Sequence, residues 1–142
     1  MIDGRIIRFF RKHHVLTVAT TVNNEAWCAN CFYVYLKEEN TLVFTTGPET
    51  RHGQEFLKNK MIAGSVVLET RIIGLIRGIQ FQGIVFEPEG SLLGKAKSAY
   101  LKRFPVAMLM KTTLWVVELT CIKMTDNRLG FGKKLIWRKE DK

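Results

Sequence analysis

The residues best placed for chemistry lie where an expected strand gives way to an expected helix. Thr45 and Thr46 end the strand, a Gly-Pro turn follows, and Thr50 caps a helix that carries Arg51 and His52 in its first turn. Helix N-termini present unpaired N–H groups and a positive dipole end, which suit a phosphate. The same dipole disfavours basic residues there, so an anion over the helix start would explain Arg51 and His52. Alternatively, Thr50 only caps the helix while Arg51 points into solvent, and the sequence leaves both interpretations open.

A weaker candidate is the glycine-rich segment Gly130-Phe131-Gly132-Lys133-Lys134. Its glycines would let backbone amides approach a phosphate, and Lys133 would add a positive charge. The segment lacks the glycine spacing and the Ser or Thr of the phosphate-binding loop, and it does not match the dinucleotide fingerprint. A glycine-rich turn between two strands is the favoured interpretation.

Three side-chain amides on expected strands are candidates for contacting an aromatic cofactor. Asn30 interrupts an apolar strand, while Gln80 and Gln82 alternate with apolar residues on another. An apolar slot with a few polar groups is typical of cofactor sites. Buried amides need hydrogen-bond partners, which are either a ligand or, more commonly, neighbouring backbone.

Other reactive residue types are present without a catalytic pattern. Cys28 and Cys31 form a C-x-x-C pair, but residues three apart on a strand point to opposite faces, so we expect no metal site there. The chain has no G-x-S-x-G serine, no Cys–His pair at nucleophile spacing and no convincing pair of carboxylates. The catalytic residues are therefore unknown, and in an enzyme a bound cofactor would carry the reaction.

Length and composition indicate one globular domain over residues 1–142. Hydrophobic residues make up 46% and charged residues 25% of the chain. No apolar run approaches the roughly 18 residues of a membrane span, and the charged N-terminus does not read as a secretory signal, so we expect a cytoplasmic protein. The net charge of +9 favours an anionic partner. Nucleic acid is not the favoured one, because no basic stripe with interleaved aromatics is evident.

Turn residues and hydrophobic periodicity divide the chain into helices and strands. The expected helices cover Ile2–Lys12, Thr50–Asn59 and Leu92–Phe104, and the expected strands cover Val15–Thr21, Ala26–Leu36, Thr41–Thr46, Met61–Leu68, Ile72–Phe86, Leu114–Lys123 and Lys134–Arg138. A helix does not separate every pair of strands, as a parallel sheet would require. The order therefore predicts a closed antiparallel β-barrel with helices over its openings.

Five ordered motifs resemble one known family over nearly the whole chain. They are W-C-A-N from Trp27, T-R-H from Thr50, L-I-R-G-I-Q-F-Q-G from Leu75, R-F-P-V-A from Arg103 and T-D-N-R-L-G-F-G-K-K-L-I-W from Thr125. They resemble the FMN-binding split-barrel superfamily, that of pyridoxamine 5′-phosphate oxidase, and within it the YhbP-like branch.

The resemblance implies a mainly β fold, a six-stranded antiparallel split barrel with short helices. It also implies a flavoprotein that acts as an oxidoreductase on a small molecule, and a homodimer with FMN at its two-fold interface. The alternative is a non-catalytic flavin- or haem-binding or sensor module on the same barrel. The expected cofactor-binding residues are Asn30, Thr45, Thr46, Thr50, Arg51, His52, Gln80, Gln82 and Lys133.

Two departures from the family pattern limit what the resemblance implies. His52 stands where the family usually has a lysine at the FMN phosphate. The His-Asp-Arg part of the segment that holds the substrate phosphate is missing after Arg128-Leu129. The resemblance therefore does not extend to vitamin B6 oxidation.

Overall fold

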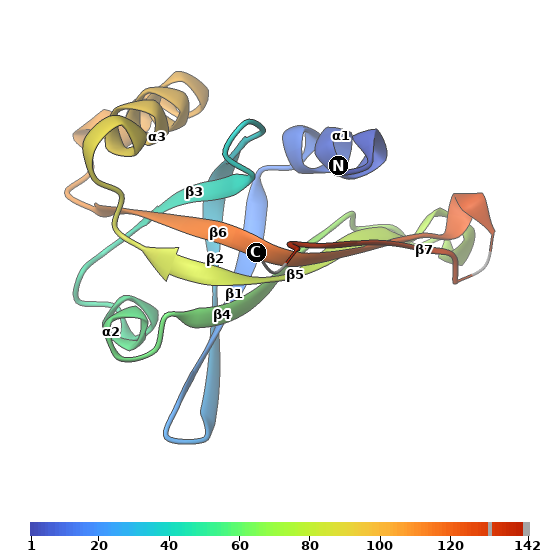
Figure 1. Ribbon diagram of the computed structural model, residues 1–142, viewed down its shortest axis with the longest axis horizontal. Helices are drawn as coiled ribbons and strands as arrows, with labels where there is room; N and C mark the ends of the chain where they lie inside the picture. Colours follow the sequence, from blue (N-terminus) through green and yellow to red (C-terminus); the bar gives the residue numbers. More distant parts are fainter. Residues whose placement is uncertain (131, 141–142) are drawn as a thin grey trace.

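A computed structural model describes residues 1–130 and 132–140 (Figure 1). Its elements are α1 Gly4–Lys12, β1 Val15–Val22, β2 Glu25–Leu36, β3 Thr41–Thr46, α2 Arg51–Lys58, β4 Met61–Val67, η1 Ile73–Leu75, β5 Arg77–Phe86, α3 Gly90–Arg103, η2 Pro105–Leu109, β6 Thr113–Asp126, η3 Asn127–Leu129 and β7 Lys134–Arg138. Within the described residues, the structure contains no helix that is long and apolar enough to cross a membrane.

The strands form one antiparallel sheet that closes on itself. Their order is β3-β2-β1-β4-β5-β6, and β3 pairs back onto β6, so that six strands make a ring. β7 lies outside the ring: one edge of β6 pairs with β3 over residues 113–118 and with β7 over residues 121–125. The other edge of β6 pairs with β5. This topology confirms the expected mainly β, six-stranded antiparallel barrel and adds one strand to it.

An apolar core fills the ring, because alternate residues of each strand face inward. Phe10 from α1 and Phe56 from α2 also belong to this core. Burial of each such aromatic side chain contributes about 1.5–3 kcal/mol to stability. Strand residues of this core include Leu16, Val18, Tyr33, Phe44, Ile62, Phe81 and Ile122.

Helix α1 begins where its N-cap residue supplies an acceptor. The Asp3 carboxylate accepts a hydrogen bond of 2.8 Å from the Arg5 backbone N–H. Ile6, Phe9 and Phe10 form the buried face of the helix. The helix thereby presents its remaining, largely basic face to solvent.

Helix α3 packs outside the ring, where Ala96 and Tyr100 lie against Val43 and Val116. Near its C-terminus, the Arg103 guanidinium donates hydrogen bonds to the carbonyl oxygens of Arg11, His13 and Tyr33, at 3.1, 2.5 and 3.1 Å. These bonds join the end of α3 to the end of α1 and to β2.

The expected strand over Ile72–Phe86 was wrong in its first part. Strand β5 begins at Arg77, and the residues before it form the short 3-10 turn η1. Backbone bonds from Leu75 N–H to the Ile72 carbonyl and from Ile76 N–H to the Ile73 carbonyl close this turn. The apolar side chains that suggested a strand are exposed there, with Ile73 at 63%.

The two cysteines of the C-x-x-C pair point to opposite faces of β2, as expected for residues three apart on a strand. Cys31 is buried in the core and Cys28 is exposed.

Candidate functional site

The turn between β3 and α2 is fastened by a threonine at the helix start. The Thr50 hydroxyl donates to the Gly47 carbonyl at 2.8 Å and accepts from the Gly53 N–H at 3.1 Å. A Cβ on Gly53 would lie 2.8 Å from Thr50 Oγ1 and 3.1 Å from the Gly47 oxygen, so this tight turn requires glycine at that position. The N-cap role of Thr50 expected from the sequence is confirmed.

His52 points back toward the strand. Its Nε2 atom forms a hydrogen bond with the Thr46 hydroxyl and lies 3.4 Å from the Thr50 hydroxyl. Its ring lies edge-on to Phe56, with centroids 5.8 Å apart. Burial lowers the pKa of His52 below its usual value, and the nearby Glu55 only partly opposes this effect. The ring is therefore neutral at pH 7 and brings hydrogen-bonding capacity rather than positive charge.

Arg51 is held in place by two acidic residues and an indole ring. Its Nε donates to Glu55 at 2.8 Å, and its guanidinium carbon lies 4.3 Å from the centre of the Trp27 ring. One terminal nitrogen is 3.5 Å from the Glu25 carboxylate, a long contact. The Arg51 side chain is 46% exposed, so its terminal nitrogens remain accessible.

Glu55 is the buried anchor of this arrangement. Its residue is 6% exposed, and its carboxylate also accepts a hydrogen bond of 2.9 Å from the Thr20 hydroxyl. The hydrogen bond from Arg51 lowers the pKa of Glu55, so the carboxylate is ionised at neutral pH. The sequence reasoning missed Glu55, Thr20 and Trp27 here. The four-residue spacing of Arg51 and Glu55 on one helix was the signal that could have found the first.

The helix start can bind an anion through its backbone. Helical geometry leaves the N–H groups of Arg51 and His52 without acceptors inside the helix, while Thr50 satisfies that of Gly53. These two amides and the positive dipole end lie at the helix start, while the Arg51 side chain runs toward Glu55, Glu25 and Trp27. The structure thus brings the side chains of three expected residues together, Thr46, Thr50 and His52, while the Arg51 side chain contacts Glu55 and Trp27 instead.

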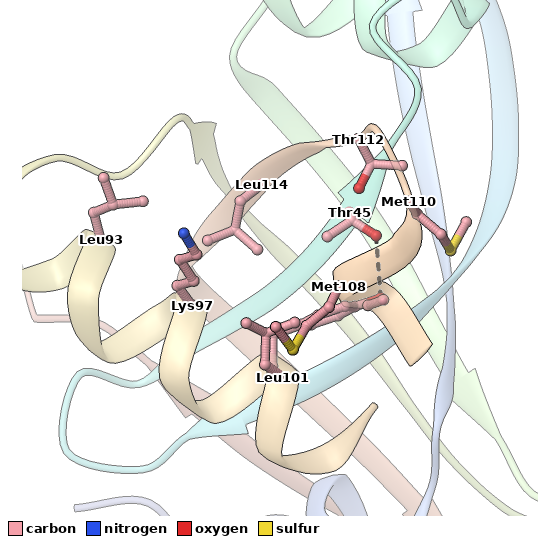
Figure 2. Close-up of a pocket in the computed structure, with 10 residues that line it drawn as sticks. Thr45, Leu93, Lys97, Leu101, Met108, Met110, Thr112 and Leu114 are labelled. Atoms are coloured by element: carbon pink, nitrogen blue, oxygen red, sulfur yellow. Dashed lines mark hydrogen bonds between the residues drawn. The ribbon is translucent and has the colours of Figure 1, made fainter. Parts of the chain in front are cut away.

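Thr45 belongs to a different surface, because successive strand residues face opposite ways. Its hydroxyl donates to the Tyr100 hydroxyl at 3.2 Å, and Tyr100 donates in turn to the Phe32 carbonyl. Figure 2 shows Thr45 beside a cavity of about 420 Å³ between α3, η2, β3 and β6. Leu93, Leu101, Leu114, Met108 and Met110 give this cavity an apolar lining, and Lys97 and Thr112 add polar groups.

Asn30, Gln80 and Gln82 lie on the outer face of the barrel and are exposed in the single chain. Strand register places them in two rows. The first row is Asn30, Thr17, Ser65, Gln80 and Lys123, and the second is Cys28, Ala19, Ala63, Gln82 and Cys121. Thr17 donates to the Asn30 side-chain oxygen at 2.7 Å. The small residues of these rows leave a hollow of about 440 Å³.

Lys133 lies far from the helix start. It is in the connection between η3 and β7, at the opposite end of the sheet from α2 (Figure 1). Its N–H donates to the Gly130 carbonyl and its own carbonyl accepts from Asp126 N–H, so the segment is a turn before β7. Phe131 of the same segment lies outside the described residues. Within one chain, Lys133 does not join the other candidates.

Comparison with known proteins finds close relatives in sequence. No family model matches the chain. A UPF0306 protein of Photorhabdus laumondii is 44% identical over 134 residues, which span 94% of each chain. A UPF0306 protein of Yersinia pseudotuberculosis is 44% identical over 132 residues, or 93% of this chain and 90% of the relative.

Comparison with solved structures identifies the fold. A haem-binding protein of Mycobacterium smegmatis matches with a TM-score of 0.79 at 17% identity, over 97% of this chain and 59% of that one. An FAD-binding protein of Mesorhizobium loti matches with a TM-score of 0.70 at 10% identity, over 87% of this chain and 94% of that one. The neighbours are split-barrel proteins, which confirms the fold class.

Proposed function

This chain belongs to the UPF0306 family, and we propose that it is a flavoprotein that binds FMN and uses it for oxidation or reduction of a small molecule. One observation carries the proposal: the amides of Arg51 and His52, which helical geometry leaves without acceptors inside the helix, lie at the start of α2 beside the hydroxyl groups of Thr46 and Thr50. The resemblance to the FMN-binding split-barrel superfamily and its YhbP-like branch puts the FMN phosphate at this helix start. Solved neighbours that bind FAD or haem support a cofactor-binding barrel in general.

The residues at the helix start fit a phosphate monoester. Backbone amides and the two terminal nitrogens of Arg51 supply donors, and Thr50 and Thr46 add hydroxyl groups nearby. Glu55 and Trp27 hold the Arg51 side chain in position before any ligand binds, which reduces the entropy lost on binding. Neutral His52 would orient Thr46 and Thr50 rather than neutralise the phosphate.

The proposal includes a homodimer with the cofactor at its interface. The outer face around Gln80 and Gln82 is hollow and carries exposed apolar side chains: Val15, Phe32, Met61 and Val67 are between 46% and 68% exposed. A hollow with mostly apolar walls, surrounded by exposed apolar side chains, is typical of surfaces that bind a partner. A two-fold partner over this face would bury the three amides Asn30, Gln80 and Gln82 and could bring its own Lys133 toward the cofactor.

In this proposal the cofactor carries the chemistry and the protein positions it. FMN supplies reversible transfer of one or two electrons when bound. The chain's part is to hold the phosphate at α2 and to offer side-chain amides as hydrogen-bond partners on the outer face. The cavity beside Thr45 and Tyr100 has room for the apolar part of a substrate.

The test is the visible absorption spectrum of freshly purified protein, followed by titration of the cofactor-free protein with FMN. We expect a flavin band and saturable binding. Arg51→Ala should weaken FMN binding by about tenfold to a hundredfold, since hydrogen bonds to charged groups are worth about 1.5–3 kcal/mol. Arg51→Lys should recover part of the loss, and Lys102→Ala, which removes an exposed charge from the last turn of α3, serves as the matched control.

Colourless protein that ignores added FMN would contradict the proposal. A haem spectrum, or stable flavin binding without reaction with nicotinamide cofactors or oxygen, would instead support the alternative of a non-catalytic haem- or flavin-binding module. The haem-binding neighbour from Mycobacterium smegmatis is the observation that keeps this alternative in the test.

A further inference from the structure

A second concentration of positive charge lies away from α2, in a pocket of about 260 Å³ between α1, β5, β6 and η3. Three of its basic side chains come from α1, at positions whose spacing places them on one face of the helix. We call it the cationic pocket. Its basic residues are Arg5, Arg8, Lys12, Arg77 and Arg128.

Carboxylates compensate only part of this charge. Asp3 pairs with Arg5 at 2.8 Å, and Asp126 pairs with Arg128 at 3.0 Å. Arg8, Lys12 and Arg77 form no ion pair with any carboxylate of residues 1–130 and 132–140. Five cationic groups and two carboxylates leave a local charge of +3 near neutral pH.

Arg77 provides a second, independent observation in favour of a ligand in this pocket. Its Nε atom is buried and has no hydrogen-bond partner among the described residues. A buried donor without a partner is costly, so native structures usually supply one. Arg77 begins β5 opposite Asp126 of β6, yet the Asp126 carboxylate receives its bonds from Arg128.

Buried apolar residues beneath the pocket reduce the screening of its positive charges by water. The floor of the pocket contains buried Phe9 and Met124, which exclude water from beneath the charges. The pKa of neighbouring His13 is lowered, first by burial and then by the charges of Lys12 and Arg77. A field that disfavours one more positive charge favours an anion in the same place.

We infer that the cationic pocket binds a compact phosphate-type polyanion, such as pyrophosphate, at a site distinct from the cofactor phosphate. Arginine guanidinium groups bind phosphate oxygens through paired donors, and four of the five cations are arginines. A local charge of +3 calls for a ligand with several negative charges on few atoms. The volume is below the roughly 300–1,000 Å³ of drug-sized ligand sites, which favours a compact anion over a nucleotide.

The experiment is isothermal titration calorimetry of the full-length protein with pyrophosphate, performed on wild type and three variants. Wild type should bind at the cationic pocket, and the double variant Arg8→Gln/Lys12→Gln should bind at least tenfold more weakly. Both substituted side chains are exposed, so folding should be preserved. The matched control Lys60→Gln/Lys102→Gln removes two exposed charges elsewhere and should bind like wild type.

The third variant separates this site from the cofactor site. Arg51→Ala should leave pyrophosphate binding intact, and Arg8→Gln/Lys12→Gln should leave FMN binding intact. The inference is overturned by absence of pyrophosphate binding, by equal weakening in the Lys60/Lys102 control, or by loss of pyrophosphate binding in Arg51→Ala. Binding to vesicles of anionic phospholipid without binding of soluble pyrophosphate would also overturn it. Loss of pyrophosphate binding in Arg51→Ala would move the anion site to α2, whereas the other three outcomes leave the proposed FMN site at α2 unaffected.

Discussion

The start of α2 and the cationic pocket both present donors to an anion, but they do so by opposite means. At α2 the one arginine is already paired with Glu55, the histidine is neutral, and the free donors are backbone amides. In the cationic pocket Arg8, Lys12 and Arg77 have no acidic partner among the described residues, and the donors are side chains. Anion binding at α2 therefore depends on backbone geometry, and anion binding in the cationic pocket depends on net charge. The two affinities should respond differently to a change in the α2 turn, to salt and to pH.

The largest expected effect comes from changing the shape of the α2 turn. In Gly53→Ala the new Cβ would lie 2.8 Å from Thr50 Oγ1, which displaces the capping hydroxyl and costs about 1 kcal/mol of stability. FMN affinity should fall more than tenfold, as measured by fluorescence titration, while pyrophosphate binding is kept.

Gly94→Ala is the matched control for this change. A Cβ at Gly94 in α3 meets nothing within 4 Å, so alanine should stabilise the helix by up to about 1 kcal/mol. Equal FMN affinity in Gly53→Ala and wild type would show that the cap geometry does not matter for binding.

The next largest effect is a difference in how strongly salt weakens anion binding at the two regions. Between about 0.05 and 0.5 M salt, pyrophosphate binding should weaken roughly tenfold, because the exposed charges of the cationic pocket are screened. FMN binding should change less, since amides of fixed geometry contribute much of it. Parallel titrations at several salt concentrations measure both slopes, and identical slopes would refute the distinction.

A smaller effect is expected from the acid that holds Arg51. Glu55→Gln removes one negative charge beside the proposed phosphate, so FMN affinity should rise a few-fold while stability falls through the weaker bond to Arg51. Equilibrium titration with FMN and urea unfolding measure the two effects. A loss of affinity would mean that the position of Arg51 outweighs its free charge.

The smallest effect concerns pH. The folded-state pKa values of His52 and His13 are lowered, so the unfolded chain binds more protons at mildly acidic pH. The stability that neutral histidines contribute is complete above their unfolded pKa of about 6.5 and is lost as pH falls toward the lower folded values. Urea unfolding from pH 7.5 to 5 should show this decline, and His52→Asn should make it shallower.

The sequence allowed the barrel and the α2 site to be predicted because their signals are local. Turn residues divide the strands, and Thr50 with Arg51 and His52 marks one helix start within three residues. Thr45 shows the limit of this reasoning: strand alternation turns it toward Tyr100, which is 55 residues away in the chain. The exposed isoleucines before Arg77 show that apolar composition alone does not distinguish a strand from a turn.

The cationic pocket could not be predicted from the sequence, because its residues are distant from one another along the chain. Arg8 and Arg77 come from distant parts of the chain, and Arg128 lies beyond the end of β6. Only the register of β5 against β6 and the docking of α1 bring them together. In the sequence these cations are scattered, and their shared pocket depends on long-range pairing that local patterns do not encode.

The division of one β6 edge between β3 and β7 has a consequence for how the molecule opens. Because β3 already closes the ring, β7 can detach from residues 121–125 while all six ring strands stay paired. Amide protons of β7 should then exchange with solvent through a local opening, whereas those of β3 should exchange only when the barrel unfolds as a whole. Leu135 and Trp137 of β7 pack against the core, so this local opening would cost their contacts while the ring of six strands stays closed.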